Sequence, residues 1–287
     1  MRRLFFSALT LGVSLLSACS SGSTSATEAE QYYTDVKKNL VALDYQAALK
    51  NLDRLIKAGE GQPLGREGVI VRTALLTAMA DGSKRMGDAY RDGSSQPAAG
   101  AFKGQFARMK SDYYGISRMR LMSAMEALLP QRAKLGEELM PLQLDFPDFT
   151  GQEPATVTKV RNGTWPSDTE RYRAEMEMIK NALARTLGGM VGAGDDAAKG
   201  KAIFSKGGVQ IDSRVYLIDL SSTFLRLNDV FGRKALDDPR NARITLEVVR
   251  DNLDLATKML EKKPDKDLEV RVKNLKAECE KALKALP

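Results

Sequence analysis

The stretch REGVIVRTALLTAMADGSKRMGDAYR, residues 66–91, carries small or apolar side chains at every third or fourth position. This is the period of one face of an α-helix. Two glycines, Gly82 and Gly87, lower the helix propensity, but they allow a neighbouring backbone to approach closely. The stretch therefore predicts one long helix that packs tightly. The period is marked by Ile70, Ala74, Ala78, Met86 and Ala89.

The helical period recurs along most of the chain, which predicts an all-α fold. Residues 213–231 are apolar on several sides, so this segment is expected to be the central buried helix. Short loops between consecutive segments favour helical hairpins stacked as an irregular array or bundle. With 66–91, the predicted helices number eight, and the others cover about 33–43, 45–55, 101–129, 167–188, 213–231, 237–260 and 268–283.

Two segments depart from this pattern. Residues 130–166 hold Pro130, Pro141, Pro147, Pro154 and Pro166, and they predict one long non-helical insertion with a possible domain sub-boundary. The segment IFSKGGVQI, residues 203–211, is typical of a small β-hairpin around its glycine pair.

The composition of the chain excludes several functions. The 287 residues include no histidine and two cysteines, so Ser-His-Asp and Cys-His catalysis and histidine-ligated zinc are ruled out. The formal net charge of +7 is spread along the chain, without the clustered basic and aromatic residues that nucleic-acid binding requires. We therefore expect no metal, no cofactor and no nucleic-acid partner.

Two segments resemble tetratricopeptide repeats. DYQAALKNLDRLIKAG, residues 44–59, has the Tyr-x-x-Ala-x-x-x-Leu pattern of the second helix of that repeat. LDLATKMLEKKP, residues 253–264, has the Ala-x-x-x-Leu-x-x-x-Pro pattern of a repeat ending. No regular 34-residue period runs between them, so the resemblance implies repeat-like ends rather than a regular solenoid.

The N-terminus resembles the signal peptide of bacterial lipoproteins. Arg2 and Arg3 precede an apolar stretch from Leu4 to Leu16, which is shorter than the roughly 20 residues that span a bilayer. The following Leu-Ser-Ala-Cys, ending at Cys19, is similar to a lipobox. The resemblance implies cleavage before Cys19 and acylation of that residue, with several acyl chains forming a durable membrane anchor.

Ser20 follows the cysteine in place of the aspartate that, in that family, favours retention in the inner membrane. The resemblance therefore implies the outer membrane, with the protein facing the periplasm. Residues 20–30, SSGSTSATEAE, are small and polar and predict a flexible tether. The expected organisation is a signal peptide over 1–18, a lipidated cysteine and tether over 19–30, and an α-helical domain over 31–287.

No residue set marks a catalytic centre. Carboxylates alone can perform acid–base chemistry, and Asp145 with Asp148 or Asp81 with Asp88 are candidates. Asp81 and Arg85 are also ordinary neighbours four residues apart on a helix. Because nothing distinguishes one pair, we expect the protein not to be an enzyme. Cys279 lies on the apolar face of the last helix, where a buried, inert thiol is expected.

Two functions remain. The first is a non-catalytic, lipid-anchored envelope protein that binds another protein or a peptide through the surface of its helical repeats. The second is an accessory solute-binding or transport lipoprotein with an apolar pocket between helices. In either case the binding residues are expected in the insertion, at Phe146, Phe149 and Trp165, although these rings can also serve only to pin the insertion to the helices.

Overall fold

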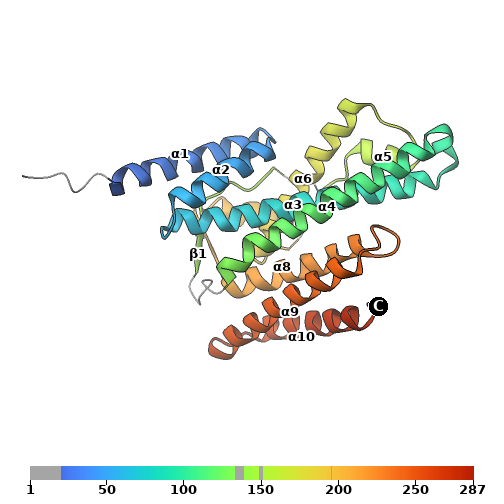
Figure 1. The fold of residues 1–287 in the computed structure, drawn as a ribbon. Helices are drawn as coiled ribbons and strands as arrows, with labels where there is room; N and C mark the ends of the chain where they lie inside the picture. The colour runs from blue at the N-terminus through green and yellow to red at the C-terminus, as the bar shows by residue number, and fades with distance from the viewer. Residues whose placement is uncertain (1–20, 133–138, 149–150, 195) are drawn as a thin grey trace, which may run out of the picture.

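The computed structural model describes residues 21–132, 139–148, 151–194 and 196–287 (Figure 1). In these ranges the chain forms α-helices packed against one another and one two-stranded sheet, which confirms the all-α class. No helix in the described ranges is long and apolar enough to cross a membrane. The helices are α1 (Ser21–Val41), α2 (Tyr45–Ala58), α3 (Pro63–Ser94), α4 (Lys103–Arg132), α5 (Ala155–Arg161), α6 (Asp168–Met190), α7 (Ala197–Phe204), α8 (Ser213–Leu227), α9 (Pro239–Lys262) and α10 (Lys266–Lys284).

The predicted long helix is α3, and it lies at the centre of the molecule. It packs against α2, α4, α5, α6 and α8, and Figure 1 shows the α1–α2 hairpin and the α8–α10 group on opposite sides of it. A Cβ at Gly82 would lie 3.0 Å from the backbone nitrogen of Ile179, and one at Gly87 would lie 2.7 Å from the Tyr114 ring. The expected close approach of a neighbouring backbone is therefore confirmed at Gly82, whereas the close neighbour at Gly87 is a side-chain ring. The expectation that 213–231 is central was wrong, because α8 is buried but α3 has neighbours on more sides.

The first helix begins earlier than the sequence predicted. Residues from Ser21 onward lie in α1, where a flexible tether was expected as far as residue 30. Ala29 is 2% exposed and extends the apolar face of Tyr33 and Val36 by one turn. Small polar residues have modest helix propensity, so this turn is stabilised by packing rather than by its own preference.

The chain also forms more helices than the eight expected, because the short α5 and α7 were missed. Thr and Val in α5 and Gly200 in α7 disfavour isolated helices. Tertiary contacts compensate: Val157 and Val160 of α5 are completely buried. The insertion is accordingly shorter than 130–166. Helix α4 continues through Pro130, and a capping box of Ser167 and Glu170 begins α6.

The prediction of a β-hairpin at 203–211 was also wrong. Ile203 and Phe204 end α7, and only Val209–Ile211 form a strand, β2. Its partner is β1, Met140–Leu142, which pairs antiparallel with Met140 opposite Ile211. Gly207 and Gly208 have positive φ angles and make the turn that leads into β2. A strand partner this far away in sequence leaves no local signature.

The C-terminal helices follow the sequence closely. Asp212, Asp238 and Asp265 cap the N-termini of α8, α9 and α10 with side-chain hydrogen bonds. Cys279 is 1% exposed, and its Sγ lies 3.2 Å from the carbonyl oxygen of Leu246, which confirms the expected buried position. Burial raises the pKa of this thiol, so it is mainly protonated and unreactive at neutral pH.

Candidate functional site

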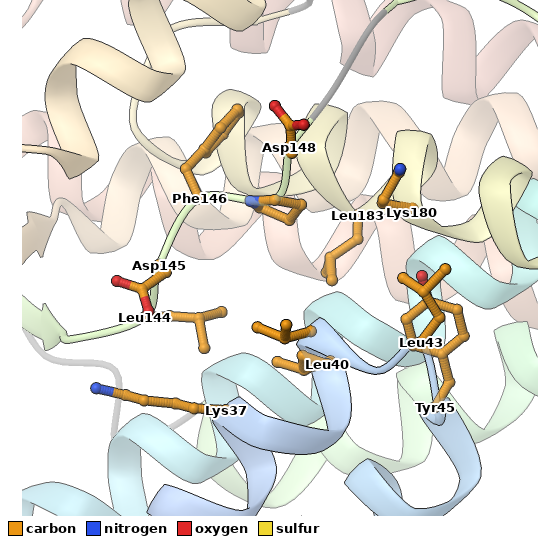
Figure 2. A pocket seen from close by; sticks show the side chains of 12 residues that line it. Lys37, Leu40, Leu43, Tyr45, Leu144, Asp145, Phe146, Asp148, Lys180 and Leu183 are labelled. Atoms are coloured by element: carbon orange, nitrogen blue, oxygen red, sulfur yellow. The ribbon is translucent and has the colours of Figure 1, made fainter.

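A pocket of about 360 Å³ lies where the α1–α2 turn meets residues 144–148 and helix α6. We call it the α1–α2 pocket. Figure 2 shows Leu40, Leu144 and Leu183 facing one another across it. Lys37 and Asp145 lie at one end, and Asp148 and Lys180 lie at the other. The lining is completed by Val41, Leu43, Tyr45, Phe146 and Pro147, so it is mainly apolar.

The turn between α1 and α2 forms one wall. Leu43 adopts a φ of 59°, in the left-handed region that is unfavourable for a residue with a Cβ. Asp44 follows and caps α2, accepting a hydrogen bond of 3.0 Å from the backbone N–H of Ala47. The Tyr45 hydroxyl donates to the carbonyl oxygen of Met176 in α6, 3.3 Å away. The turn thus presents Leu43 to the pocket and is fastened to the helix opposite.

The wall formed by residues 144–148 is held by a buried carboxylate. Glu67 of α3 is 2% exposed, and one of its oxygens accepts hydrogen bonds from the Tyr33 hydroxyl and the Gln143 backbone N–H. Three segments, α1, α3 and the strand leading into the wall, therefore meet at one side chain. Burial raises the pKa of Glu67; the two hydrogen bonds and the charge of Lys37 oppose this shift without cancelling it.

Phe146 closes the pocket on the side of α7. Its ring centroid lies 5.2 Å from that of Phe204. A Cβ at Gly200 would come within 2.6 Å of the Phe146 ring, so the missing side chain at Gly200 makes room for it. Phe146 is half-buried: one part of its ring packs on α7, and the other faces the cavity.

The charged groups at the rim balance. Lys37 and Lys180 are matched by Asp145 and Asp148, and Lys180 is also paired with Glu177 at 2.7 Å. The described residues that line the pocket therefore offer an apolar interior and carry two positive and two negative charges. Within the described ranges, no three or more Asp, Glu and Cys side chains are grouped so as to hold a metal ion.

The structure separates the aromatic residues that the sequence grouped together. Phe146 lines the α1–α2 pocket, whereas Trp165 packs in a different cluster, 5.4–5.9 Å from the rings of Tyr90, Phe102 and Phe106. Trp165 therefore does not line the α1–α2 pocket; it fastens the end of the insertion to α3 and α4, as the alternative of a pinning ring predicted. Phe149 and Cys19 lie outside the described residues.

The sequence did not single out the rest of the pocket. Leu40, Tyr45 and Leu183 lie in segments that were predicted as helices, but the sequence pattern of a helix face that encloses a cavity is the same as that of a face that fills a core. The one local signal is at Val41-Ala42-Leu43-Asp44, where the helical period breaks before the next begins. The candidate pair Asp145 and Asp148 lies on the rim, while Asp81 and Asp88 have separate partners, Arg226 and Lys84 among them.

The fold and this site define an all-α array of helices with an apolar pocket at its N-terminal side. Comparisons with protein-family models, with curated proteins and with solved structures found no match.

Proposed function

We propose that this chain is a non-catalytic, lipid-anchored protein of the cell envelope that binds a small apolar molecule in the α1–α2 pocket. The observation that carries the proposal is the cavity of about 360 Å³ itself. Pockets that hold small molecules have volumes of about 300–1,000 Å³ and are lined mainly by apolar side chains. The α1–α2 pocket falls within this range.

The chemistry of the lining indicates what kind of molecule is bound. Four leucines and Phe146 supply apolar contacts, and the balanced rim gives no preference for an anion or a cation. An uncharged apolar or zwitterionic ligand is therefore favoured over a fatty acid or an amine. Balanced charges at the mouth also hold water there, which favours a ligand with a polar end.

Binding of an uncharged fluorescent probe, N-phenyl-1-naphthylamine, tests the pocket. We expect saturable binding at one site per chain. Leu40→Trp should weaken it about tenfold or more, because the larger ring occupies the cavity and displaces apolar contacts worth at least about 1.4 kcal/mol. Leu129→Trp on α4 is the matched control, since Leu129 is 44% exposed and does not line the pocket. Equal binding by both variants would exclude this site.

The anchor is tested separately. Cys19→Ala should abolish incorporation of labelled palmitate and leave an unprocessed precursor in the membrane fraction. The proposed outer-membrane location, facing the periplasm, follows from the same segment, so fractionation of the unaltered chain on a density gradient tests it. Unchanged labelling of the variant would remove the lipoprotein assignment without affecting the proposal for the pocket.

A protein or peptide partner is the second candidate. Val41, at the rim, is 79% exposed, an unusual position for a large apolar side chain next to an apolar cavity. A partner protein that inserts an apolar side chain into the pocket would cover both Val41 and the apolar cavity. Purification from detergent extracts distinguishes the candidates: a partner protein should be retained by the unaltered chain and lost with Val41→Asp, whereas a solute is found by mass spectrometry of the purified protein.

A further inference from the structure

A second cavity, of about 280 Å³, lies on the other side of α6 from the apolar pocket, between α3, α6 and α8. Its charged lining differs from that of the first. Arg85 of α3, Arg185 of α6 and Arg226 of α8 all line it, with Asp219 as the only acidic side chain among the described lining residues. We call it the arginine cavity.

The three arginines converge on one buried carboxylate. Asp81 is 2% exposed and accepts hydrogen bonds from Nη1 of Arg226 at 2.6 Å, Nη2 of Arg185 at 3.1 Å and Nε of Arg85 at 3.2 Å. Each guanidinium carries five N–H donors in a rigid plane, so one contact with Asp81 leaves donors over at each arginine. Asp81 thus fixes the arginines in place without saturating them.

The charge of the cluster is out of balance. Three guanidiniums face the single charge of Asp81, and Asp219 is itself paired with Arg271 at 2.9 Å. Two positive charges therefore remain uncompensated among the described residues of the cluster. Among the described residues, the buried Nε of Arg185 has no hydrogen-bond partner. Burial and the charge of Arg85 lower the pKa of Arg185, which indicates that the cations repel one another.

The remaining lining is polar and is open to a ligand. Ser222 and Thr223 lie on α8 beside Arg226, and their hydroxyls can donate to an anion. The end of α6 is close by, and two of its last carbonyl oxygens already accept hydrogen bonds: Gly188 accepts from the N–H of Ala193 at 2.7 Å, and Gly189 accepts from that of Gly192 at 2.9 Å.

We propose that the arginine cavity binds a phosphoryl group, carried by a small phosphate ester or as free phosphate. A phosphate dianion has the charge that the cluster lacks, and its oxygens match the forked N–H geometry of arginine. Arg85 and Arg226 are the contacts that face solvent, since their side chains are 38% and 47% exposed. The side chain of Arg185 is 17% exposed, so this arginine would contact the phosphoryl group from the buried side of the cavity.

Calorimetric titration of the full chain with inorganic phosphate tests this site, with sodium chloride keeping the ionic strength constant. Saturable binding at one site is expected. Arg85→Gln and Arg226→Gln should each weaken it about tenfold or more, as expected for loss of a hydrogen bond from a charged group. Arg108→Gln makes the same change of charge on α4, where Arg108 is 84% exposed, and should leave the affinity unchanged.

A further variant serves as a control for loss of folding. Should Arg226→Gln fail to fold, Arg226→Lys keeps a positive charge beside Asp81 but loses the planar fork, and it should still weaken phosphate binding. Two competitors identify the source of the phosphoryl group: glycerol 3-phosphate represents soluble esters, and dihexanoyl phosphatidic acid represents a lipid headgroup. Displacement of phosphate by either one supports the site. No saturable binding, or equal weakening by Arg108→Gln, overturns the proposal.

Discussion

Glu67 and Asp81 lie on the same helix, α3, and each is 2% exposed, yet their surroundings have opposite effects on their charge. Burial opposes ionisation of Asp81, but the charges of Arg226, Arg85 and Arg185 outweigh burial and lower its pKa to about 2. At Glu67 no arginine is among the groups that shift the pKa, and burial prevails over the hydrogen bonds from Gln143 and Tyr33.

The comparison shows that burial alone does not decide the charge of a carboxylate. The partners decide it, and they also decide what the residue does. Asp81 is ionised and orders three cations around a polar cavity. Glu67 is a hydrogen-bond acceptor at the meeting point of three segments, and it holds the wall of an apolar pocket. One helix thus supports two sites of different chemistry.

The largest effect is expected from Asp81→Asn. Removing one partner of a buried ionic cluster leaves uncompensated charge, which costs about 3–5 kcal/mol of unfolding free energy. Denaturant unfolding at pH 7 measures the loss. Because the pKa of Asp81 is lowered in the folded state, its contribution is present above the ordinary pKa and is lost as pH falls toward 2. The difference between variant and unaltered chain should therefore shrink at low pH.

Asp112→Asn is the matched control for that experiment. Asp112 is 54% exposed and is paired with Arg108 at 3.9 Å, so the change should cost less than about 1 kcal/mol. Equal losses for Asp81→Asn and Asp112→Asn would show that the three arginines do not depend on the buried carboxylate.

Tyr33→Phe should have an intermediate effect. It removes the hydroxyl that donates to Glu67 and leaves a buried acceptor with one fewer partner, at a cost of about 1–3 kcal/mol. Tyr32→Phe on the same helix also removes one hydroxyl and serves as the control, expected within about 0.5 kcal/mol of the unaltered chain. Since Glu67 positions the wall at Gln143, Tyr33→Phe should also weaken probe binding in the α1–α2 pocket, and Tyr32→Phe should not.

The smallest expected effect is the pH dependence of the unfolding free energy of Glu67→Gln, and its direction is clearly defined. The folded-state pKa of Glu67 is raised, so its contribution to stability is complete below the ordinary pKa and is lost as pH rises through the folded-state value. Glutamine does not titrate. The unfolding free energy of Glu67→Gln minus that of the unaltered chain should therefore increase between pH 4 and pH 8. A difference that stays constant or decreases would contradict the raised pKa.

The helices could be predicted from the sequence because their signals are local. The apolar period of α3, the capping box at Ser167 and the proline after α9, Pro264, are three such signals. Each depends on residues only a few positions apart in the sequence, and the structure contains each of them. The buried position of Cys279 followed from the same period. The role of Gly82, close contact with another helix, is likewise a local signal, whereas the identity of the contacting helix, α6, is not.

What could not be predicted depends on contacts between distant residues. Strand β1 pairs with β2 across some 70 intervening positions, and α5 forms because Val157 and Val160 find a buried surface. The pairing of Asp81 with Arg85 was visible in the sequence, but Arg185 and Arg226 lie 104 and 145 residues away from it. The two cavities arise where such segments meet, so neither could be located from local patterns.

The position of residues 139–148 also has a consequence for the order in which the protein folds. This segment is fastened at Gln143 to Glu67, 76 residues earlier, and through β1 to β2, which follows it by a similar distance. Closing loops of this length costs conformational entropy before any contact compensates for it, so we expect both contacts to form after local helices such as α3. The wall of the α1–α2 pocket is then completed last. In a pulse-labelled refolding experiment, the Gln143 amide should gain protection from hydrogen exchange after the amides of α3, and a newly synthesised chain would form its helices before its apolar pocket.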